Sequence, residues 1–304
     1  MMMGGREEAI PVTIDLDQFP AQSGKLVEAC EGLGCFRVVN HKIPLQLMSE
    51  MKSVVRSLLD LPAETKLRNT DTIAGSGYVG PTPKNPLYEA LGLHDINSSE
   101  AVDAFCDQLD ATTRQRETIK SYARGMHNLA MDIGHKISQG LGIEGDVCRE
   151  WPIQFRINKY SFTEESVGSL GVQLHTDSGF LTILQEDECV GGLEVMDKSG
   201  QFISIDPMPG SLLVNLGDVA KVWSNGRFCN VKHHVQCKEA VTRITIAVFL
   251  LGPVEDEVEA PPELVDADHR RIYLPFTYEG YRKRRLSTGL RAGEALELYT
   301  IQNA

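Results

Sequence analysis

The sequence predicts an α+β protein in which helices come first and an antiparallel barrel or jelly roll follows. Up to about residue 150, the apolar residues repeat mainly with the period of an amphipathic helix. From Pro152 onward, short segments of alternating polar and apolar residues recur between Gly, Pro, Asn and Asp, as antiparallel sheets require. Because helices and strands do not alternate along the chain, a Rossmann or TIM-barrel fold is not expected. The 304 residues, 42% of them hydrophobic, suffice for a sizeable core.

The N-terminal region is expected to span 10–110, after a mobile tail over 1–9. The alternation in Ile10–Leu16 predicts a short strand. Ser23 can cap a helix, and Gly34 can end it, because serine accepts from free helix N–H groups and glycine adopts the left-handed conformation that follows a helix.

Five further segments complete the expected organisation. Apolar residues at helical spacing predict a helix between Pro44 and Pro62, whereas Thr70–Pro86 is dense in Gly, Pro, Ser and Thr and predicts a loop at the rim of an active site. The apolar stripe within 111–150 predicts one long supporting helix. The β-rich core is expected over 151–252, and a C-terminal segment with a helix over 253–304.

The composition excludes several kinds of partner. Lysine and arginine number 30 against 42 acidic residues, which gives a net charge of −12. That field repels polyphosphates, so neither nucleic acid nor an anionic membrane is expected as a partner. No membrane-spanning run and no signal peptide are visible. The seven cysteines lack CxxC spacing and are expected to be free, buried thiols. We expect a cytoplasmic monomer that acts on a small molecule.

A candidate metal site lies within the β-rich core. His175 and Asp177 are two residues apart in an extended segment, so their side chains project to the same side. His233 shares a strand face with Val231 and Val235, and these apolar neighbours place it inward. Two histidines and one carboxylate leave three positions open on the metal, as in Fe(II) oxygenases, although zinc could use the same ligands for hydrolysis.

A second polar cluster predicts an anion-binding cavity. Arg243 and Thr245 share one face of an otherwise apolar strand, and Arg156, Asn158 and Tyr160 share one face of another. A buried guanidinium needs an anion, and its planar fork matches a carboxylate. We infer a dicarboxylate cosubstrate that chelates the metal and extends its far carboxylate to Arg243, Thr245 and Tyr160.

These motifs resemble those of the plant 2-oxoglutarate and Fe(II)-dependent dioxygenases. The resemblance consists of His-x-Asp, the distal His233, the Arg-x-Ser/Thr motif, the triplet Asn158-Lys159-Tyr160 and the upstream segment GCFRVVNH. Segments such as LRNTDTIAGSGY and VWSNGRFCNVKHHVQCKEA resemble, in particular, the members that oxidise auxin.

The resemblance carries several expectations. It implies a double-stranded β-helix (jelly roll) core with flanking N-terminal helices and a C-terminal helix. It implies Fe(II) held by His175, Asp177 and His233, with 2-oxoglutarate, O2 and ascorbate as a reductant. Arg243, Thr245, Tyr160 and Asn158 would hold 2-oxoglutarate, which is converted to succinate. The implied reaction hydroxylates indole-3-acetic acid, or its amino-acid conjugates, at indole C2 to give the 2-oxindole and so inactivates auxin.

The sequence departs from the family pattern at two positions near these motifs. His234 stands where the family has arginine, and we expect it to point away from the metal. Thr245 stands where many relatives have serine, and it keeps the hydroxyl. The basic run Arg282–Arg285 is expected to form a solvated helix face, and Asn215–Asp218 a turn that supports the barrel.

The residues that hold the substrate are less clearly marked. An aromatic acid needs an apolar slot and a cationic group. Candidates for the slot are Tyr78, Tyr88, Phe180 and Phe249, and Arg156 is the candidate for the carboxylate. Each aromatic residue could equally pack in the core or on the surface, and Arg156 could pair with a structural acid.

Three alternative functions remain open at this point. The same fold and site could serve another plant aromatic acid or a specialised metabolite. A zinc hydrolase would use the three metal ligands without needing Arg243. A non-catalytic small-molecule binding module would bind its ligand without releasing succinate.

Overall fold

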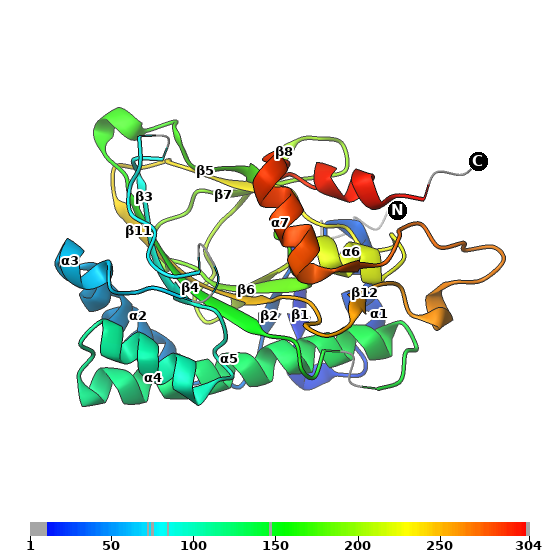
Figure 1. The fold of residues 1–304 in the computed structure, drawn as a ribbon, viewed down its shortest axis with the longest axis horizontal. Coiled ribbons are helices and arrows are strands. Elements are labelled where there is room, and N and C mark those ends of the chain that lie inside the picture. The colour runs from blue at the N-terminus through cyan, green and yellow to red at the C-terminus, as the bar shows by residue number, and fades with distance from the viewer. Residues whose placement is uncertain (1–10, 72, 74–75, 84, 146–147, 302–304) are drawn as a thin grey trace, which may run out of the picture.

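The computed structural model describes residues 11–71, 73, 76–83, 85–145 and 148–301. The expected tail over 1–9 lies outside these residues. Within them, helices flank a core of two sheets that are antiparallel except for one parallel strand pair at the edge of the larger sheet, and the C-terminal helix stands beside the open end of that core (Figure 1). This is the jelly-roll α+β fold predicted from the sequence. No helix in these ranges is both long and apolar enough to span a bilayer.

Two sheets form the core. The larger has the strand order β1-β2-β9-β6-β11-β4-β3, and the smaller has the order β5-β10-β7-β8. The strands of the larger sheet are β1 (Thr13–Asp15), β2 (Cys35–Val39), β3 (Tyr88–Leu93), β4 (Ile153–Ser161), β6 (Leu181–Gln185), β9 (Leu212–Leu216) and β11 (Thr242–Leu250). Those of the smaller sheet are β5 (Leu170–His175), β7 (Leu193–Met196), β8 (Phe202–Ile205) and β10 (His233–Gln236).

The helices cover one face of the larger sheet. The longest, α5 (Thr113–Gly140), begins at a capping box between Thr112 and Gln115 and lies along that face (Figure 1). The other N-terminal helices are α1 (Ser23–Gly32), α2 (Leu45–Leu59), α3 (Ala63–Lys66) and α4 (Ser99–Gln108). Because α1, α2 and α4 all contact α5, this helix joins the layer into one unit.

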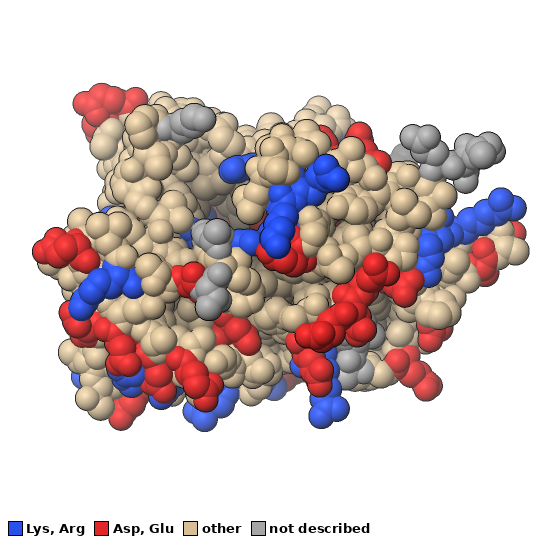
Figure 2. Space-filling model, viewed as in Figure 1, with Lys and Arg blue, Asp and Glu red and all other residues tan. Residues whose placement is uncertain are grey.

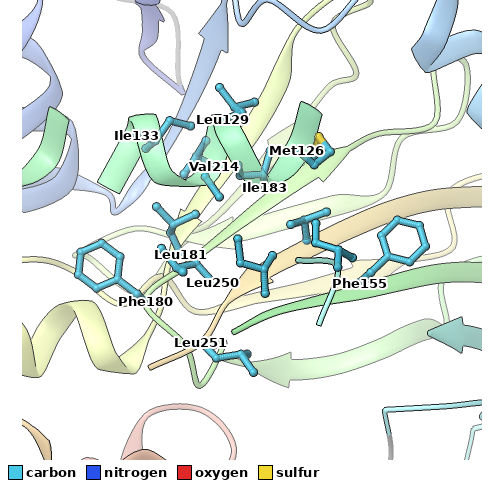
Figure 3. Close-up of a cluster of buried hydrophobic side chains, with 14 of the residues drawn as sticks. Met126, Leu129, Ile133, Phe155, Phe180, Leu181, Ile183, Val214, Leu250 and Leu251 are labelled. Carbon is cyan, nitrogen blue, oxygen red and sulfur yellow. The ribbon is translucent and has the colours of Figure 1, made fainter. Parts of the chain in front are cut away.

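The hydrophobic core lies between α5 and the larger sheet. Met126, Leu129 and Ile133 of α5 point toward Ile183 and Val214 on the sheet (Figure 3). All five are buried, and burying a side chain of this kind contributes about 1.5–3 kcal/mol. The outer face of the larger sheet thus packs against the helices, and its inner face is left to form the functional site.

The C-terminal segment packs beside the open end of the jelly roll. Its elements are β12 (Glu257–Val258), β13 (Phe276–Thr277), α7 (Tyr278–Thr288) and the short 3-10 helix Glu294–Tyr299. Thr277 caps α7 by accepting from the Gly280 N–H, and Gly289 ends it with a φ of 72°. In Figure 1, α7 stands next to α6 (Asp218–Trp223), which follows β9.

Some elements differ from the sequence prediction. Helix α1 begins at Ser23, but the capping position is Gln22, which makes no side-chain cap bond. Strand β3 and helix α4 were not predicted; β3 has a weak sequence pattern, YEALGL, and its extended state comes from pairing with β4 over its whole length. The seven cysteines are free, as expected, but Cys189 is exposed and Cys229 is half-buried, so the expectation that all of them are buried is wrong.

Candidate metal centre and cosubstrate cavity

Neighbouring strands of the smaller sheet bring the three predicted metal ligands together. His175 ends β5 and lies directly opposite His233, the first residue of β10, while Asp177 follows β5 in the next turn. One ligand atom from each residue lies within 4.8 Å of the others. Asp177 Oδ1 is 3.7 Å from His175 Nε2 and 3.9 Å from His233 Nε2. Two imidazole nitrogens and one carboxylate oxygen form a donor set that fits Fe(II).

Hydrogen bonds on the far side of each ligand fix its orientation. His175 Nδ1 lies 2.8 Å from the Gln173 carbonyl oxygen, and His233 Nδ1 lies 3.1 Å from the Val231 carbonyl oxygen. Because a carbonyl can only accept, each Nδ1 carries the proton and each Nε2 keeps its lone pair for a metal. The Thr182 hydroxyl donates to Asp177 Oδ2 at 2.5 Å, which leaves Oδ1 facing the histidines.

The surroundings hold His175 and Asp177 in the charge states that bind a metal. Burial, followed by the repulsion of His233, lowers the pKa of His175 to about 4, so its imidazole is neutral at physiological pH. Burial alone would raise the pKa of Asp177, but the two histidines, Thr182 and Arg285 together lower it below its ordinary value. The carboxylate therefore stays ionised.

A cavity of about 140 Å³ extends from this cluster into the space between the two sheets. Figure 2 shows the molecule hollowed beside α7, with basic side chains at the rim. The cavity is lined by the three ligand candidates, by Arg243, Thr245, Tyr160 and Asn158, and by apolar side chains such as Leu184, Leu193 and Val235. The structure thus brings the two polar clusters predicted from the sequence into one chamber.

Arg243 provides the chamber with a buried cation. Its side chain is 2% exposed, and its guanidinium carbon lies 5.3 Å from the centre of the Tyr160 ring. Its Nε is buried without a hydrogen-bond partner among the described residues, so the chamber is prepared to receive an anion. Next to it, Asn158 Nδ2 donates to Thr245 Oγ1 at 3.4 Å.

Three of the five proposed substrate contacts line the cavity. Tyr88, Arg156 and Phe249 do so, and the Tyr88 hydroxyl accepts from Arg156 Nε at 3.1 Å. Tyr78 does not line it, and its hydroxyl donates to Glu89 at 2.8 Å.

Phe180 also lies away from the chamber, so the expectation that it contacts substrate is wrong. It is fully buried between Trp151 and Trp223, with ring centroids 5.6 Å and 5.4 Å away. The chain turns at Ser178 and Gly179 before β6 begins, and this turn directs Phe180 into the hydrophobic core.

Sequence reasoning missed several polar residues of the site. Thr182 and Asn215 lie opposite each other on β6 and β9, and both line the cavity. The alternation in FLTILQ places Thr182 on the face opposite Ile183 and could have revealed it. Asn215 stands in the apolar run LLVNL and is buried, and a polar residue in such a run is itself a signal.

Two further expectations need correction. His234 faces away from the metal cluster, as expected, but it is buried: it contacts Glu194 at 2.8 Å, and its ring lies 4.2 Å from that of Phe202. The run Arg282–Arg285 is not wholly solvated, because Arg285 is buried. Asp218, the residue that contacts Arg285, is completely buried at the start of α6.

Comparison with known proteins defines the class of this protein. Residues 153–252 match the family model of the 2OG-Fe(II) oxygenase superfamily, and residues 10–119 match that of the N-terminal region of the non-haem dioxygenase in morphine synthesis. The chain belongs to the 2OG-Fe(II) oxygenase superfamily and is a 2-oxoglutarate-dependent dioxygenase, with Fe(II) and 2-oxoglutarate as its cofactors.

Individual relatives match almost the whole chain. The 2-oxoglutarate-dependent dioxygenase DAO of Oryza sativa subsp. japonica is 57% identical over 276 residues, which cover 90% of this chain and 92% of that protein. The crystal structure of the rice dioxygenase for auxin oxidation covers 95% of this chain and 99% of its own, with a TM-score of 0.89 and 54% identity. Dioxygenase for auxin oxidation 1 from Arabidopsis thaliana, in a binary complex with 2-oxoglutarate, covers 85% of this chain and 99% of its own, with a TM-score of 0.83 and 56% identity.

Proposed function

We propose that this dioxygenase inactivates auxin by oxidising indole-3-acetic acid, or its amino-acid conjugates, at indole C2 to the 2-oxindole form. The observation that carries the proposal is the 57% identity with the rice enzyme over 90% of the chain. The described cavity supports it, because one chamber combines a candidate iron site with cationic groups and an apolar wall.

Each polar group of the chamber receives a role in this proposal. His175, Asp177 and His233 hold Fe(II), since their ligand atoms already converge. Arg243 and Thr245 hold the far carboxylate of 2-oxoglutarate, Tyr160 and Asn158 complete the pocket around it, and all four line the cavity. Arg243 is the main anchor, because its orphaned Nε and its planar fork suit a carboxylate.

A second guanidinium supports an acidic substrate. Arg243 pairs in register with Tyr160, whereas Arg156 pairs with Ala247 farther along the same two strands. Tyr160 and Arg156 are four residues apart, which corresponds to roughly 13 Å along a strand. One arginine can therefore hold 2-oxoglutarate while Arg156, with the Tyr88 hydroxyl beside it, holds the substrate carboxylate.

The protein contributes position and exclusion of water to the reaction. When bound, Fe(II) with 2-oxoglutarate supplies the dioxygen activation that no protein side chain provides. Arg243 and Thr245 fix the orientation of the cosubstrate relative to the metal ligands. Phe249 and Ala247 line the wall beside Arg156 and offer the indole ring an apolar surface. Such placement accounts for a large part of the rate enhancement in reactions of this kind.

Succinate release tests the substrate assignment. The enzyme is reconstituted anaerobically with Fe(II) and 2-oxoglutarate, then exposed to O2 with indole-3-acetic acid, its aspartate conjugate or indole-3-ethanol, which lacks the carboxylate. We expect either indole acid to yield the 2-oxindole product and an equal amount of succinate, and the alcohol to yield far less. If neither acid is turned over, the enzyme acts on another plant aromatic acid or specialised metabolite.

We also propose that the enzyme acts as a monomer in the cytoplasm. The net charge of −12 supports a protein that stays in solution rather than on an anionic surface. Light scattering with and without indole-3-acetic acid would test the monomer, and a fluorescent fusion in plant cells would test the location.

A further inference from the structure

The C-terminal helix reaches the metal-binding turn through one buried guanidinium. Arg285 of α7 is 9% exposed and contacts Asp218, the first residue of the neighbouring α6 (Figure 1). Its Nη1 also donates to Thr176 Oγ1 at 3.1 Å. Its Nη2 donates to the carbonyl oxygens of Thr176 at 2.7 Å and Arg291 at 2.8 Å. Thr176 is the residue between two of the proposed iron ligands, so Arg285 holds the backbone that carries them.

Asp218 extends the same network to the third ligand. Its Oδ2 accepts from the Tyr281 hydroxyl at 2.6 Å, and its Oδ1 accepts from Asn230 Nδ2 at 2.7 Å. Asn230 lies in the segment that leads into His233. The backbone N–H of Asp218 donates to the Asp177 carbonyl oxygen at 2.9 Å. One completely buried residue, Asp218, thus contacts the chain beside both halves of the ligand set, through its carboxylate at Asn230 and through its backbone N–H at Asp177.

Backbone packing around this network leaves little room for movement. A Cβ atom on Gly217 would lie 2.3 Å from the Gly179 carbonyl oxygen and 2.7 Å from that of Asp177, so only glycine fits there. The Thr176 N–H donates to the Arg291 carbonyl oxygen at 2.9 Å. The metal-binding turn is therefore held by the segment after α7 as well as by α6.

We propose that Arg285 and Asp218 are positioning residues for the iron site. They fix the turn at Thr176 and the segment at Asn230, so that the two imidazoles and the carboxylate converge before iron binds. Neither residue lines the cavity, so neither contacts substrate or cosubstrate, and both hold the metal ligands in place through the backbone that carries them. The inference rests on the proposed function, in which His175, Asp177 and His233 bind Fe(II).

Iron affinity, measured without turnover, tests the proposal. Arg285→Lys keeps the cation near Asp218 but loses the planar fork that donates to two carbonyl groups at once. Fe(II) is titrated anaerobically into the apoprotein, and the visible absorption band of the Fe(II)–2-oxoglutarate complex is recorded. We expect about 10- to 100-fold weaker Fe(II) binding and a shifted band, as for other groups that orient metal ligands. Asp218→Asn should act in the same direction.

Two control variants separate positioning from general stability. Leu58→Ala removes a buried side chain from α2 and should lower the Tm while leaving iron affinity unchanged. Lys283→Gln alters an exposed residue of α7 and should change neither quantity. If Arg285→Lys lowers the Tm like Leu58→Ala but binds iron as tightly as the wild type, the network is only a scaffold and the proposal is wrong.

Two further variants keep the test decisive. His233→Ala should abolish tight iron binding; if it does not, the ligand assignment itself fails, which differs from a failure of the positioning role. If Arg285→Lys does not fold, Tyr281→Phe replaces it, because this variant removes one hydrogen bond to Asp218 without leaving an unpaired charge. Iron affinity about 10-fold weaker would support the proposal. Unchanged affinity in Tyr281→Phe would overturn it.

Discussion

At the scale of single residues, the hydroxyl of Thr182 decides how Asp177 faces a metal. It donates to Asp177 Oδ2 at 2.5 Å, while Oδ1 faces His175 and His233. A carboxylate with one oxygen held in this way offers a single ligand atom. The second position that a bidentate carboxylate would occupy on a metal would then stay free for cosubstrate or dioxygen.

Thr182→Val should therefore weaken the site while preserving its shape. Valine is close to threonine in size but cannot donate, and a hydrogen bond to a charged group contributes about 1.5–3 kcal/mol. We expect Fe(II) affinity to fall about 10-fold or more in an anaerobic titration. Thr182→Ser, which keeps the hydroxyl, is the control and should bind nearly as tightly as the wild type. Equal affinities in all three proteins would contradict the role of this bond.

Arg243→Gln should impair the use of 2-oxoglutarate. Removing one partner of a buried, charged hydrogen-bonded pair costs about 2–5 kcal/mol, so the KM for 2-oxoglutarate should rise about 30-fold or more. Initial rates of succinate formation at varied 2-oxoglutarate provide the measurement, and the KM for the indole acid serves as the control that should change little. An unchanged KM for 2-oxoglutarate would show that the cosubstrate does not rely on this cation.

At the scale of elements, strand β11 shows how one segment serves two purposes. Arg243 and Thr245 point into the cavity. Ile244, which lies between them, and Ile246, which follows them, belong to the hydrophobic core against the helices. A strand alternates its side chains between two faces, so one sequence of nine residues supplies both functions. A shift of one residue in its pairing with β4 would exchange the two faces and destroy both.

The stability contributed by one contact between β7 and β10 depends on pH. Glu194 accepts hydrogen bonds from Ser204 and contacts His234 and Lys238. Burial alone would raise the pKa of Glu194, but these three partners lower it from the ordinary 4.5 to about 2. Because the pKa is lower in the folded protein, the contribution to stability is complete above pH 4.5 and is lost as the pH falls toward 2.

Glu194→Gln should make stability less sensitive to acid. Glutamine keeps the size of the side chain but does not titrate, so the difference in unfolding free energy between wild type and variant should shrink between pH 4.5 and 2. Urea unfolding at a series of pH values measures this difference. If the two proteins lose stability in parallel over that range, the carboxylate is not the titrating group.

The elements also show which parts of the molecule were predictable from sequence. Period-2 alternation predicted the inward faces of β4 and β11 and hence the converging polar groups, because strand geometry alone determines which side chains share a face. Phe180 was a candidate only because it follows the His-x-Asp motif, and the sequence did not reveal that the turn before β6 directs it into the core. Strand alternation could not identify Arg285, because this residue lies on helix α7 and contacts Asp218, which is distant in sequence. The domain boundaries expected from the sequence remain predictions.

At the scale of the whole molecule, the two sheets contribute different parts of the site. His175 and His233 belong to the four-stranded sheet, whereas Arg243 and Thr245 belong to the seven-stranded sheet. In the proposed binding mode, one 2-oxoglutarate molecule joins the iron on the first sheet to the guanidinium on the second. The bound cosubstrate then stabilises the contact between the sheets as well as taking part in the reaction.

Ligands should therefore stabilise the fold in two steps. Fe(II) alone, under anaerobic conditions, should raise the Tm, and 2-oxoglutarate should raise it further only when the metal is present. At 100 times the Kd, a ligand that binds only the folded state adds about 2.7 kcal/mol. Differential scanning calorimetry measures both increments, and a chelator should remove both. An equal rise with 2-oxoglutarate in the chelated protein would contradict binding to the metal.

The division of the site between two sheets makes catalysis sensitive to the earliest stage of heat damage. A small separation of the two sheets would move the metal ligands away from Arg243, while the hydrogen bonds within each sheet stayed intact. Enzyme activity should therefore cease at a lower temperature than the one at which circular dichroism records melting. Brief heating should therefore abolish activity while the polypeptide remains largely folded, and cooling should restore that activity.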